Sequence, residues 1–130
     1  MARELKRILY VDDEPDIRAV AKMALENVGG FTVLLCASGV EALQGAVEFA
    51  PDLILLDVMM PEMDGPTTLA ALRRLPPLAE TPVLFFTAKV QAGEVEQLKS
   101  LGALDVVAKP FKPMQLPQTL RDIWQRAVKA

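Results

Sequence analysis

The stretch Leu53-Ile54-Leu55-Leu56-Asp57 places one carboxylate at the end of an uninterrupted apolar run. Apolar runs without alternation are typical of strands that are buried on both faces of a parallel sheet. Four further runs of this kind occur, at Arg7–Val11, Phe31–Cys36, Val83–Phe86 and Leu104–Val107. The pattern therefore predicts five buried strands, with Leu53–Leu56 as the third.

Stretches with helical spacing separate these runs and follow the last one. Capping residues, prolines and glycines mark where the helices begin and end. The predicted helices are Ile17–Val28 before Gly29-Gly30, a helix that starts at the Ser38/Glu41 capping box, a helix from Pro66 through Leu75 that Pro76-Pro77 ends, Gly93–Leu101, and Leu116–Val128. Because a proline is tolerated only in the first turn, Pro117 places the start of the last helix near Leu116, with Lys112–Gln115 as a looser entry.

Strict strand–helix alternation predicts the fold class. It indicates an α/β domain with a doubly wound, five-stranded parallel sheet, whose ligands bind at the carboxyl ends of the strands. A chain of 130 residues has the size of one domain, so residues 1–130 are expected to form one unit.

Composition excludes several functions. The chain has no histidine, which excludes histidine-based catalysis, histidine-ligated zinc and a role as a histidine phosphodonor. Its net charge of −3, without a Lys/Arg run, argues against nucleic-acid binding. No apolar stretch approaches the ~20 residues of a membrane span. The single Cys36 is expected to be a buried free thiol, which suits a reducing cytoplasm.

Polar residues fall where the predicted strands end. Each has an ordinary explanation: Asp13 or Glu14 could cap the helix that begins at Pro15, and the others could be loop or surface residues. Their convergence on one end of an apolar sheet favours a site instead. The residues at the strand ends are Asp12, Asp13, Asp57, Thr87 and Lys109.

The charges of this cluster indicate what it binds. Two carboxylates about 4 Å apart repel by ~4 kcal/mol at an effective dielectric constant of 20, and three would have raised pKa values unless a cation lies among them. An all-oxygen ligand set selects a hard ion, and Mg²⁺ fits best because it needs few carboxylates beside a phosphate. Lys109 would then meet the phosphate as a point charge and Thr87 as a hydroxyl donor. The pattern predicts phosphoryl transfer to a carboxylate nucleophile.

Four segments resemble the receiver domains of response regulators in two-component systems, in the same order and over nearly the whole chain. They are Tyr10-Val11-Asp12-Asp13-Glu14, Asp57-Val58-Met59-Met60-Pro61-Glu62-Met63-Asp64-Gly65, Phe86-Thr87-Ala88 and Lys109-Pro110-Phe111. The resemblance implies a flavodoxin-like (βα)5 fold with strand order 2-1-3-4-5. Among receivers, the chain is most similar to single-domain, chemotaxis-type regulators.

The resemblance also implies roles for individual residues. Asp57 is the expected phosphoacceptor, and Asp12, Asp13, Asp57 and the backbone carbonyl of Met59 are the expected Mg²⁺ ligands. The phosphoryl oxygens are expected on Thr87, Ala88 and Lys109, with the Met59 and Lys89 side chains flanking the group. The Lys109-Pro110 bond is expected to be cis, as in the family.

One position departs from the family. The fifth strand usually carries Tyr, Phe or His three residues before the lysine, and this chain has Val106 there. In the family that ring rotates inward when the residue equivalent to Thr87 moves toward the phosphate. Phosphorylation chemistry is therefore expected to be intact, while the usual output coupling is in question.

Two other α/β classes fit less well. A phosphatase of the haloacid-dehalogenase class would resemble D-x-D-x-[TV] after the first strand, where this chain reads Asp12-Asp13-Glu14-Pro15. A flavodoxin-like FMN binder needs a neutral phosphate loop there, and an acidic loop would repel the phosphate. Rossmann and P-loop glycine patterns do not occur in the sequence.

Within the receiver interpretation, the expected function is a phosphorylation-activated switch that is not an enzyme in its own right, although it catalyses its own modification. Its expected donor is a histidine kinase or phosphotransfer protein. Its downstream protein target is expected to bind the face formed by the fourth helix, fifth strand and fifth helix. Neither a nucleic acid nor a membrane is expected as a partner. The alternative function is a phosphate shuttle or sink. A third possibility is that the chain is a receiver within a longer protein.

Overall fold

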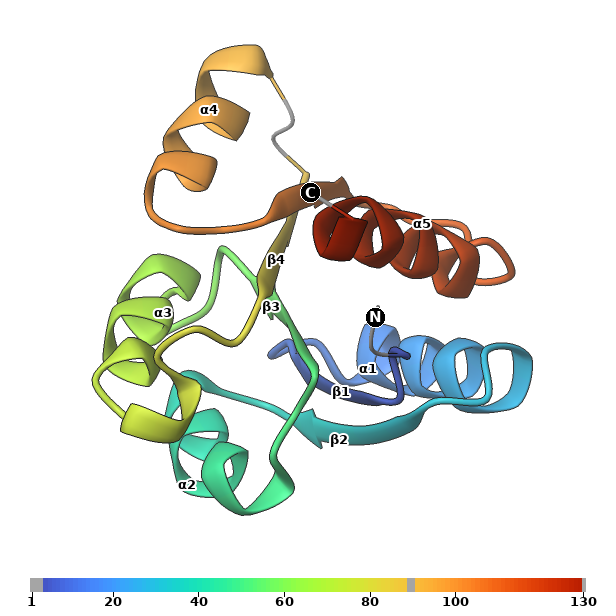
Figure 1. The fold of residues 1–130 in the computed structure, drawn as a ribbon, viewed down its shortest axis with the longest axis horizontal. Helices are drawn as coiled ribbons and strands as arrows, with labels where there is room; N and C mark the ends of the chain where they lie inside the picture. The colour runs from blue at the N-terminus through green and yellow to red at the C-terminus, as the bar shows by residue number, and fades with distance from the viewer. Residues whose placement is uncertain (1–3, 89–90, 130) are drawn as a thin grey trace.

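Among residues 4–88 and 91–129, which the computed structural model describes, five parallel strands form one sheet. The strands are β1 (Arg7–Val11), β2 (Thr32–Cys36), β3 (Leu53–Asp57), β4 (Val83–Thr87) and β5 (Asp105–Ala108). They lie in the order β2-β1-β3-β4-β5, with β1 between β2 and β3 (Figure 1). The predicted strand order and the predicted α/β fold class are confirmed.

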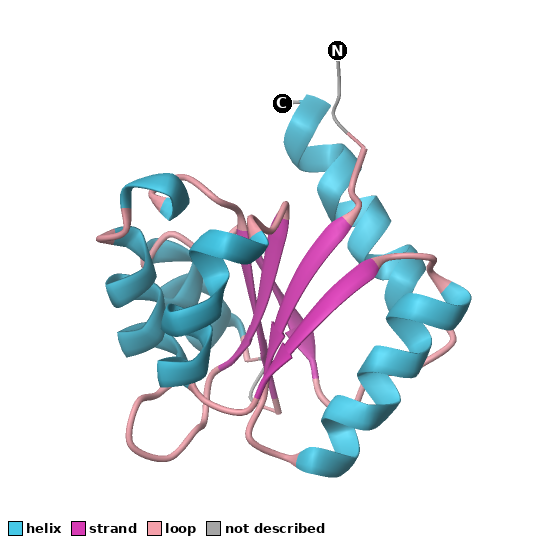
Figure 2. Cartoon of the chain, turned by 90° about the horizontal axis from the view of Figure 1, so that it is seen from below, coloured by secondary structure: helices cyan, strands magenta, loops and turns pink. Residues whose placement is uncertain are grey.

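Helices cover both faces of this sheet (Figure 2). They are α1 (Pro15–Met23), which continues into the π-helical turn η1 (Ala24–Val28), α2 (Gly39–Phe49), α3 (Gly65–Arg73), the short 3₁₀ helix η2 (Pro76–Leu78), α4 (Ala92–Ser100) and α5 (Leu116–Lys129). α1 and α5 pack on one face, and α2, α3 and α4 pack on the other. None of the helices within the described ranges is long and apolar enough to cross a bilayer.

Alternate side chains of each central strand enter two separate cores. On β1, Ile8 and Tyr10 lie in the core beneath α1 and α5, whereas Leu9 and Val11 lie in the core beneath α2 and α3. All five residues of β3 are buried. Burial on both faces explains why these segments are uninterrupted apolar runs, and each fully buried aliphatic side chain contributes about 1.5–3 kcal/mol.

The predicted starts of α2 and α5 agree with the structure. Ser38 Oγ accepts a hydrogen bond from Glu41 N at 3.1 Å, and Glu41 Oε1 accepts one from Ala37 N at 2.9 Å, so the two side chains satisfy one amide in the first turn of α2 and one just before it. α5 begins at Leu116, with Pro117 in its first turn where no helical hydrogen bond is lost.

Several predicted boundaries are wrong by one or two residues. The third helix ends at Arg73, and Leu75 is extended (φ −88°, ψ 112°) rather than helical. The residue before a proline is pushed out of the α region, so Pro76 excludes Leu75 from the helix. Leu101 caps α4 instead of belonging to it. Phe31 and Leu104 lie just before their strands but still pack in or against the core.

Cys36 is a buried free thiol, as predicted. Burial, with a smaller contribution from the Glu41 carboxylate, raises the pKa of this thiol to about 11. Cys36 therefore remains protonated at neutral pH and behaves as a small apolar core residue.

Candidate functional site

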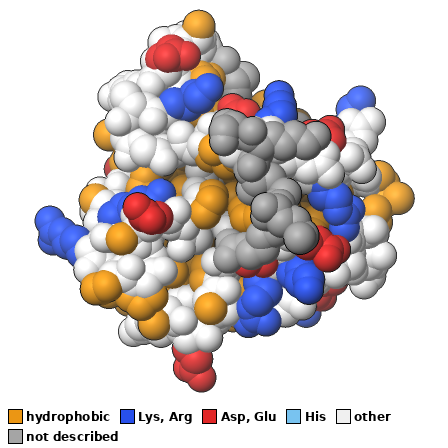
Figure 3. Space-filling model, in the orientation of Figure 1, with side chains coloured by type: hydrophobic (Ala, Val, Ile, Leu, Met, Phe, Trp, Pro, Cys, Tyr) orange, Lys and Arg blue, Asp and Glu red, His pale blue; other side chains and the backbone are white. Residues whose placement is uncertain are grey.

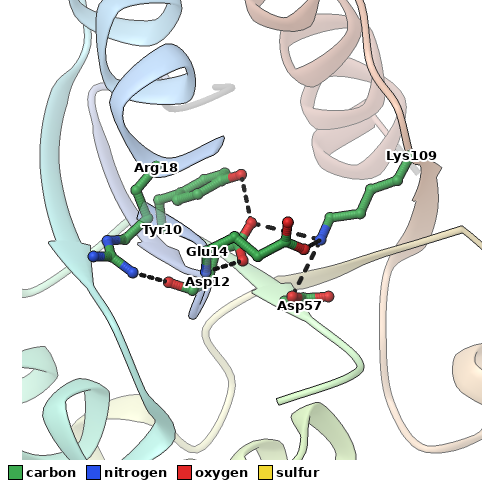
Figure 4. Close-up of polar contacts among 6 residues, drawn as sticks. All are labelled: Tyr10, Asp12, Glu14, Arg18, Asp57 and Lys109. Carbon is green, nitrogen blue, oxygen red and sulfur yellow. Dashed lines mark hydrogen bonds and ion pairs between the residues drawn. The ribbon is translucent and has the colours of Figure 1, made fainter. Parts of the chain in front are cut away.

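The carboxyl ends of four strands bring the predicted polar residues together (Figure 4). Asp12 follows β1 directly, Asp57 and Thr87 end β3 and β4, and Lys109 follows β5. Because β1, β3, β4 and β5 are neighbours in the sheet, these residues meet at one edge. Asp12, Asp57 and Thr87 are buried polar residues among the buried apolar side chains of β1, β3 and β4.

Three carboxylates form a group that could hold a metal ion. One oxygen from each of Asp12, Asp13 and Asp57 lies within 4.8 Å of the other two. These are hard oxygen donors on a partly solvated rim, since Asp13 is partly exposed while the other two are buried. Mg²⁺ prefers such ligands and keeps several waters, so the donor set fits this ion.

Lys109 faces three carboxylates at once. Its Nζ lies 3.2 Å from Asp57 Oδ2, 3.5 Å from Glu14 Oε1 and 3.6 Å from Asp12 Oδ2. Partial burial lowers the pKa of Lys109, but the charges of Asp57 and Asp12 outweigh it, and the pKa lies above its ordinary value. Lys109 is therefore a permanent cation, yet one ammonium leaves this group of carboxylates strongly negative.

The pKa of Asp57 is raised above that of an ordinary aspartate. Burial is the largest cause and raises its pKa to about 6; the Asp12 charge adds to this, and Lys109 opposes it. A pKa near 6 makes Asp57 more basic than an ordinary aspartate while leaving it ionised at neutral pH. Such a carboxylate can act as a nucleophile.

Glu14 has a different role from the capping that its position suggests. It is the N-cap residue of α1, but its carboxylate points to Lys109 Nζ across the sheet edge (Figure 4). The capping explanation is therefore wrong for Glu14.

Asp12 is anchored by groups that sequence reasoning did not assign to the site. Its Oδ1 accepts a hydrogen bond from Glu14 N at 3.0 Å, and its backbone carbonyl accepts one from Arg18 Nη1 at 2.8 Å. The hydroxyl of Tyr10 donates to Asp12 Oδ2 at 3.3 Å. Burial and the Asp12 charge raise the pKa of Tyr10 well above its ordinary value, so this hydroxyl keeps its proton. Strand alternation is the signal for Tyr10, because residues two apart point to the same side.

The segment after Asp57 passes close to the end of β3. Gly65 N donates to Val58 O at 2.9 Å, and a Cβ at Gly65 would collide with the Asp57 carbonyl oxygen and with Val58 Cα. Only glycine permits this approach, which brings the start of α3 against the site. The sequence motif Asp57–Gly65 therefore has a steric basis.

The remaining predicted positions are placed as follows. Lys109 N donates to Thr87 O at 2.9 Å, and the Lys109-Pro110 bond is cis, as expected. Ala88 and Met59 are exposed, and Met59 is 68% exposed. Val106 lies in β5 beside Phe85 and packs partly buried on the core beneath α3 and α4. Lys89 lies outside the described residues.

A model of the response regulator receiver domain matches residues 8–121 of the chain. The chain belongs to this family. The match spans the five strands from Ile8 onward and ends within the first half of α5, and the receiver resemblance that the sequence motifs suggested is confirmed.

Curated relatives share this receiver at moderate identity. The chain is 39% identical over 108 residues to protein-glutamate methylesterase/protein-glutamine glutaminase 3 of Rhodospirillum rubrum, covering 82% of this chain and 28% of that protein. It is 35% identical to the probable C4-dicarboxylate response regulator DctR of Priestia megaterium, covering 92% and 52%. It is 36% identical to the DNA-binding dual master transcriptional regulator RpaA of a Synechocystis strain, covering 94% and 50%.

Solved structures have the same fold over nearly their whole length. The chemotaxis protein CheY4 of Vibrio cholerae superposes with a TM-score of 0.84 at 32% identity, covering 92% of this receiver and 99% of that chain. A putative response regulator from Chloroflexus aurantiacus gives a TM-score of 0.82 at 32% identity, covering 95% and 100%.

The curated regulators are longer than this receiver, which spans about half of DctR and RpaA. Because RpaA is a DNA-binding regulator by name, the expectation of no nucleic-acid partner is not supported. On the face drawn in Figure 3, Lys and Arg side chains are dispersed among acidic and apolar ones. The charge distribution therefore argues against nucleic-acid binding by this receiver domain alone, and not by a longer protein that contains it.

Proposed function

We propose that this receiver accepts a phosphoryl group on Asp57 from a phosphohistidine, with Mg²⁺, and signals by altered binding of a protein partner. The position of Lys109 supports the proposal: its Nζ contacts Asp57 and Asp12 within a cluster of carboxylates that could hold a divalent cation. Asp12, Asp13 and Asp57, with the backbone carbonyl of Met59, would hold the ion. Bound Mg²⁺ would offset the negative charge of the carboxylates and of the incoming phosphoryl group.

In the transfer step, an oxygen of Asp57 attacks phosphorus while the bond between phosphorus and the donor imidazole nitrogen breaks. The phosphoryl group moves to Asp57, and the electron pair of the broken bond stays on the imidazole. Lys109 stabilises the charge that develops on the phosphoryl oxygens, and the Thr87 hydroxyl and Ala88 amide donate to the same oxygens.

An apolar groove that reaches the site at Lys109 suits the donor protein. The groove has a volume of about 340 Å³, and Lys109 forms part of its lining. Ile17 and Val20 of α1 line one wall, and Pro110 and Phe111 line the other. We propose that a histidine kinase or phosphotransfer protein docks an apolar helix face here, which presents its phosphohistidine to Asp57. These 130 residues contain no histidine, so a phosphohistidine donor would lie outside them.

The downstream target is proposed on the face formed by α4, β5 and α5. A second groove of about 270 Å³ lies there, lined by Leu104, Asp105, Ile123, Arg126 and Ala127. Val106, in the adjacent strand, favours the alternative of a phosphate shuttle or sink, because it has no ring to couple the site to this face. A reducing cytoplasm is proposed for the receiver, since it suits the free thiol of Cys36.

Acetyl phosphate tests the proposal without knowledge of the kinase. With millimolar Mg²⁺, intact-mass spectrometry should show one added phosphoryl group, which peptide mapping places on Asp57. Asp57→Asn should remain unlabelled, whereas Asp122→Asn, at an exposed α5 position, should label like the parent protein. Labelling without Mg²⁺, acid-stable phosphate at another residue, or full labelling of Asp57→Asn would refute the proposal. Binding of phosphorylated and unmodified protein to a captured partner then separates the switch from the shuttle.

A further inference from the structure

Tyr10 is the chain's single tyrosine, and it lies fully buried on β1 with its hydroxyl at the site. The hydroxyl donates to Asp12 Oδ2 at 3.3 Å (Figure 4). Asp12 itself has no solvent exposure. A buried carboxylate cannot be oriented by bulk water, so the protein groups that contact it decide where its oxygens point.

The Tyr10 ring is fixed by a second aromatic residue of the site. It stacks on Phe86 of β4, with 5.1 Å between ring centroids and 26° between ring planes. Lys109 Nζ lies 4.8 Å from the centroid of the same Phe86 ring. Tyr10 and Phe86 therefore form a rigid aromatic pair that contacts Asp12 through a hydroxyl and Lys109 through a ring face.

The contacts of Asp12 divide between its two oxygens. Oδ1 accepts from Glu14 N at 3.0 Å, while Oδ2 meets the Tyr10 hydroxyl and, at 3.6 Å, Lys109 Nζ. Lys109 is shared with Asp57 and Glu14, and it is the group expected to turn toward the phosphoryl oxygens. The Tyr10 hydroxyl can hold Oδ2 whether or not Lys109 moves.

We infer that Tyr10 is a positioning residue, whose hydroxyl fixes the Asp12 carboxylate and thereby sets the affinity of the site for Mg²⁺. The inference rests on the proposed function, in which Asp12 is a metal ligand. Hydrogen-bond donors behind metal ligands typically change metal affinity by about 10–100-fold. Tyr10 contacts no reacting atom, so its loss should change the Mg²⁺ requirement and leave the phosphoryl chemistry in place.

Tyr10→Phe removes the hydroxyl and keeps the ring that stacks on Phe86. Thr68→Val is the matched control, because Thr68 is also fully buried and donates its hydroxyl, to Asp64 O at 2.8 Å, outside the carboxylate cluster. Calorimetric titration with MgCl₂ should give a dissociation constant about tenfold weaker for Tyr10→Phe. Thr68→Val should bind Mg²⁺ like the parent protein. Acetyl phosphate labelling of Tyr10→Phe should need correspondingly more Mg²⁺ and recover at saturation.

Two results would overturn the inference while leaving the proposed function intact. One is an Mg²⁺ affinity of Tyr10→Phe equal to or tighter than that of the parent protein. The other is an equal loss of affinity in Thr68→Val, which would indicate a general effect of removing a buried hydroxyl. Failure of the parent protein to bind Mg²⁺ would instead refute the proposed function and this inference with it.

Discussion

Lys109 Nζ lies 3.2 Å from Asp57 Oδ2, although 52 positions separate the two residues in the sequence. The parallel sheet produces this contact, because β3 and β5 flank β4 and end at the same edge. In the absence of phosphate, the ammonium forms an ion pair with the nucleophile and offsets part of its charge. During transfer, the same ammonium is placed to meet the phosphoryl oxygens that arrive on Asp57.

Replacing Lys109 should therefore impair phosphorylation more than it impairs folding. For Lys109→Gln we expect labelling by acetyl phosphate to slow by at least about 100-fold, the usual cost of losing one charge-stabilising donor. Lys112→Gln, at an exposed position three residues further on, should label normally. Stopped-flow or quench-flow mass measurements give the rates, and equal rates for the two variants would contradict a role for Lys109.

Mg²⁺ should stabilise the native protein. The carboxylates of Asp12, Asp13 and Asp57 repel each other in the folded state, and an ion that binds only the folded state stabilises it by mass action. Thermal melts at neutral pH should shift upward with millimolar Mg²⁺, by about 2.7 kcal/mol of unfolding free energy at 100 times the dissociation constant. The shift should shrink in Asp12→Asn and Asp13→Asn and persist in Glu96→Gln, an exposed α4 variant. Melting indifferent to Mg²⁺ in the parent protein would argue against a metal site.

Asp57 should make stability fall as the pH rises, in the absence of metal. Its native pKa of about 6 lies above the ordinary 3.8, so between these values the folded state holds a proton that the unfolded state has lost. The free energy of unfolding should therefore decrease from about pH 4 to about pH 6, by up to about 3 kcal/mol, and be level above. Urea midpoints in EDTA measure this. Asp57→Asn should lack this contribution and should be the more stable protein at pH 7.5; a pH profile unchanged by the substitution would show that Asp57 titrates normally.

The arrangement of the site could be predicted from the sequence because two simple rules coincide. Buried parallel strands read as uninterrupted apolar runs, and their carboxyl ends share one edge of the sheet. Asp12, Asp57, Thr87 and Lys109 directly follow or end such runs, so their meeting required no knowledge of the loops.

The contacts among side chains could not be predicted in the same way. The pairing of Glu14 with Lys109 depends on the rotamer of Glu14 at the start of α1, which its position in the sequence does not specify. Leu75 has the spacing of a helical core residue, and the following proline overrides that spacing. In the sequence, Tyr10 belongs to an apolar run that predicts only a buried strand. Its contacts with the site, the ring against Phe86 and the hydroxyl against Asp12, depend on the folded structure.

Met59 should slow the loss of phosphate from Asp57. It lies two residues after Asp57 with 68% of its surface exposed, so this apolar side chain is free to lie over a phosphoryl group and hinder attack by water. Met59→Asn, which can orient a water, should lose phosphate several-fold faster. Met114→Asn is the control, since Met114 is similarly exposed, at 72%, and lies beyond β5. Unchanged or slower hydrolysis in Met59→Asn would show that Met59 is an ordinary exposed loop residue.

Val106 stands where the resemblance leads us to expect a switching ring, and here it packs against the core. It pairs with Phe85 of β4 and lies partly buried against the core beneath α3 and α4. A valine in this setting has no alternative inward rotamer of the size that a ring rotation provides. Communication from the site should therefore run through Thr87 and the segment that follows it.

Phosphorylation should consequently change residues 87–99 more than β5. A conformational equilibrium shifts only by the difference in interaction energy between its states, and one charge-assisted hydrogen bond from the Thr87 hydroxyl to the phosphoryl group supplies about 1.5–3 kcal/mol. That is enough for a shift of about tenfold to a hundredfold, which would move the start of α4 with the loop before it. Amide hydrogen exchange with and without beryllofluoride should show its largest differences in this segment. Val106→Ala should lower stability and leave the exchange pattern unchanged, because Val106 then acts only in packing. Differences at Val106, Val107 and the exposed side of α5 as large as those in residues 87–99 would instead place the coupling in β5, through a movement that needs no aromatic ring.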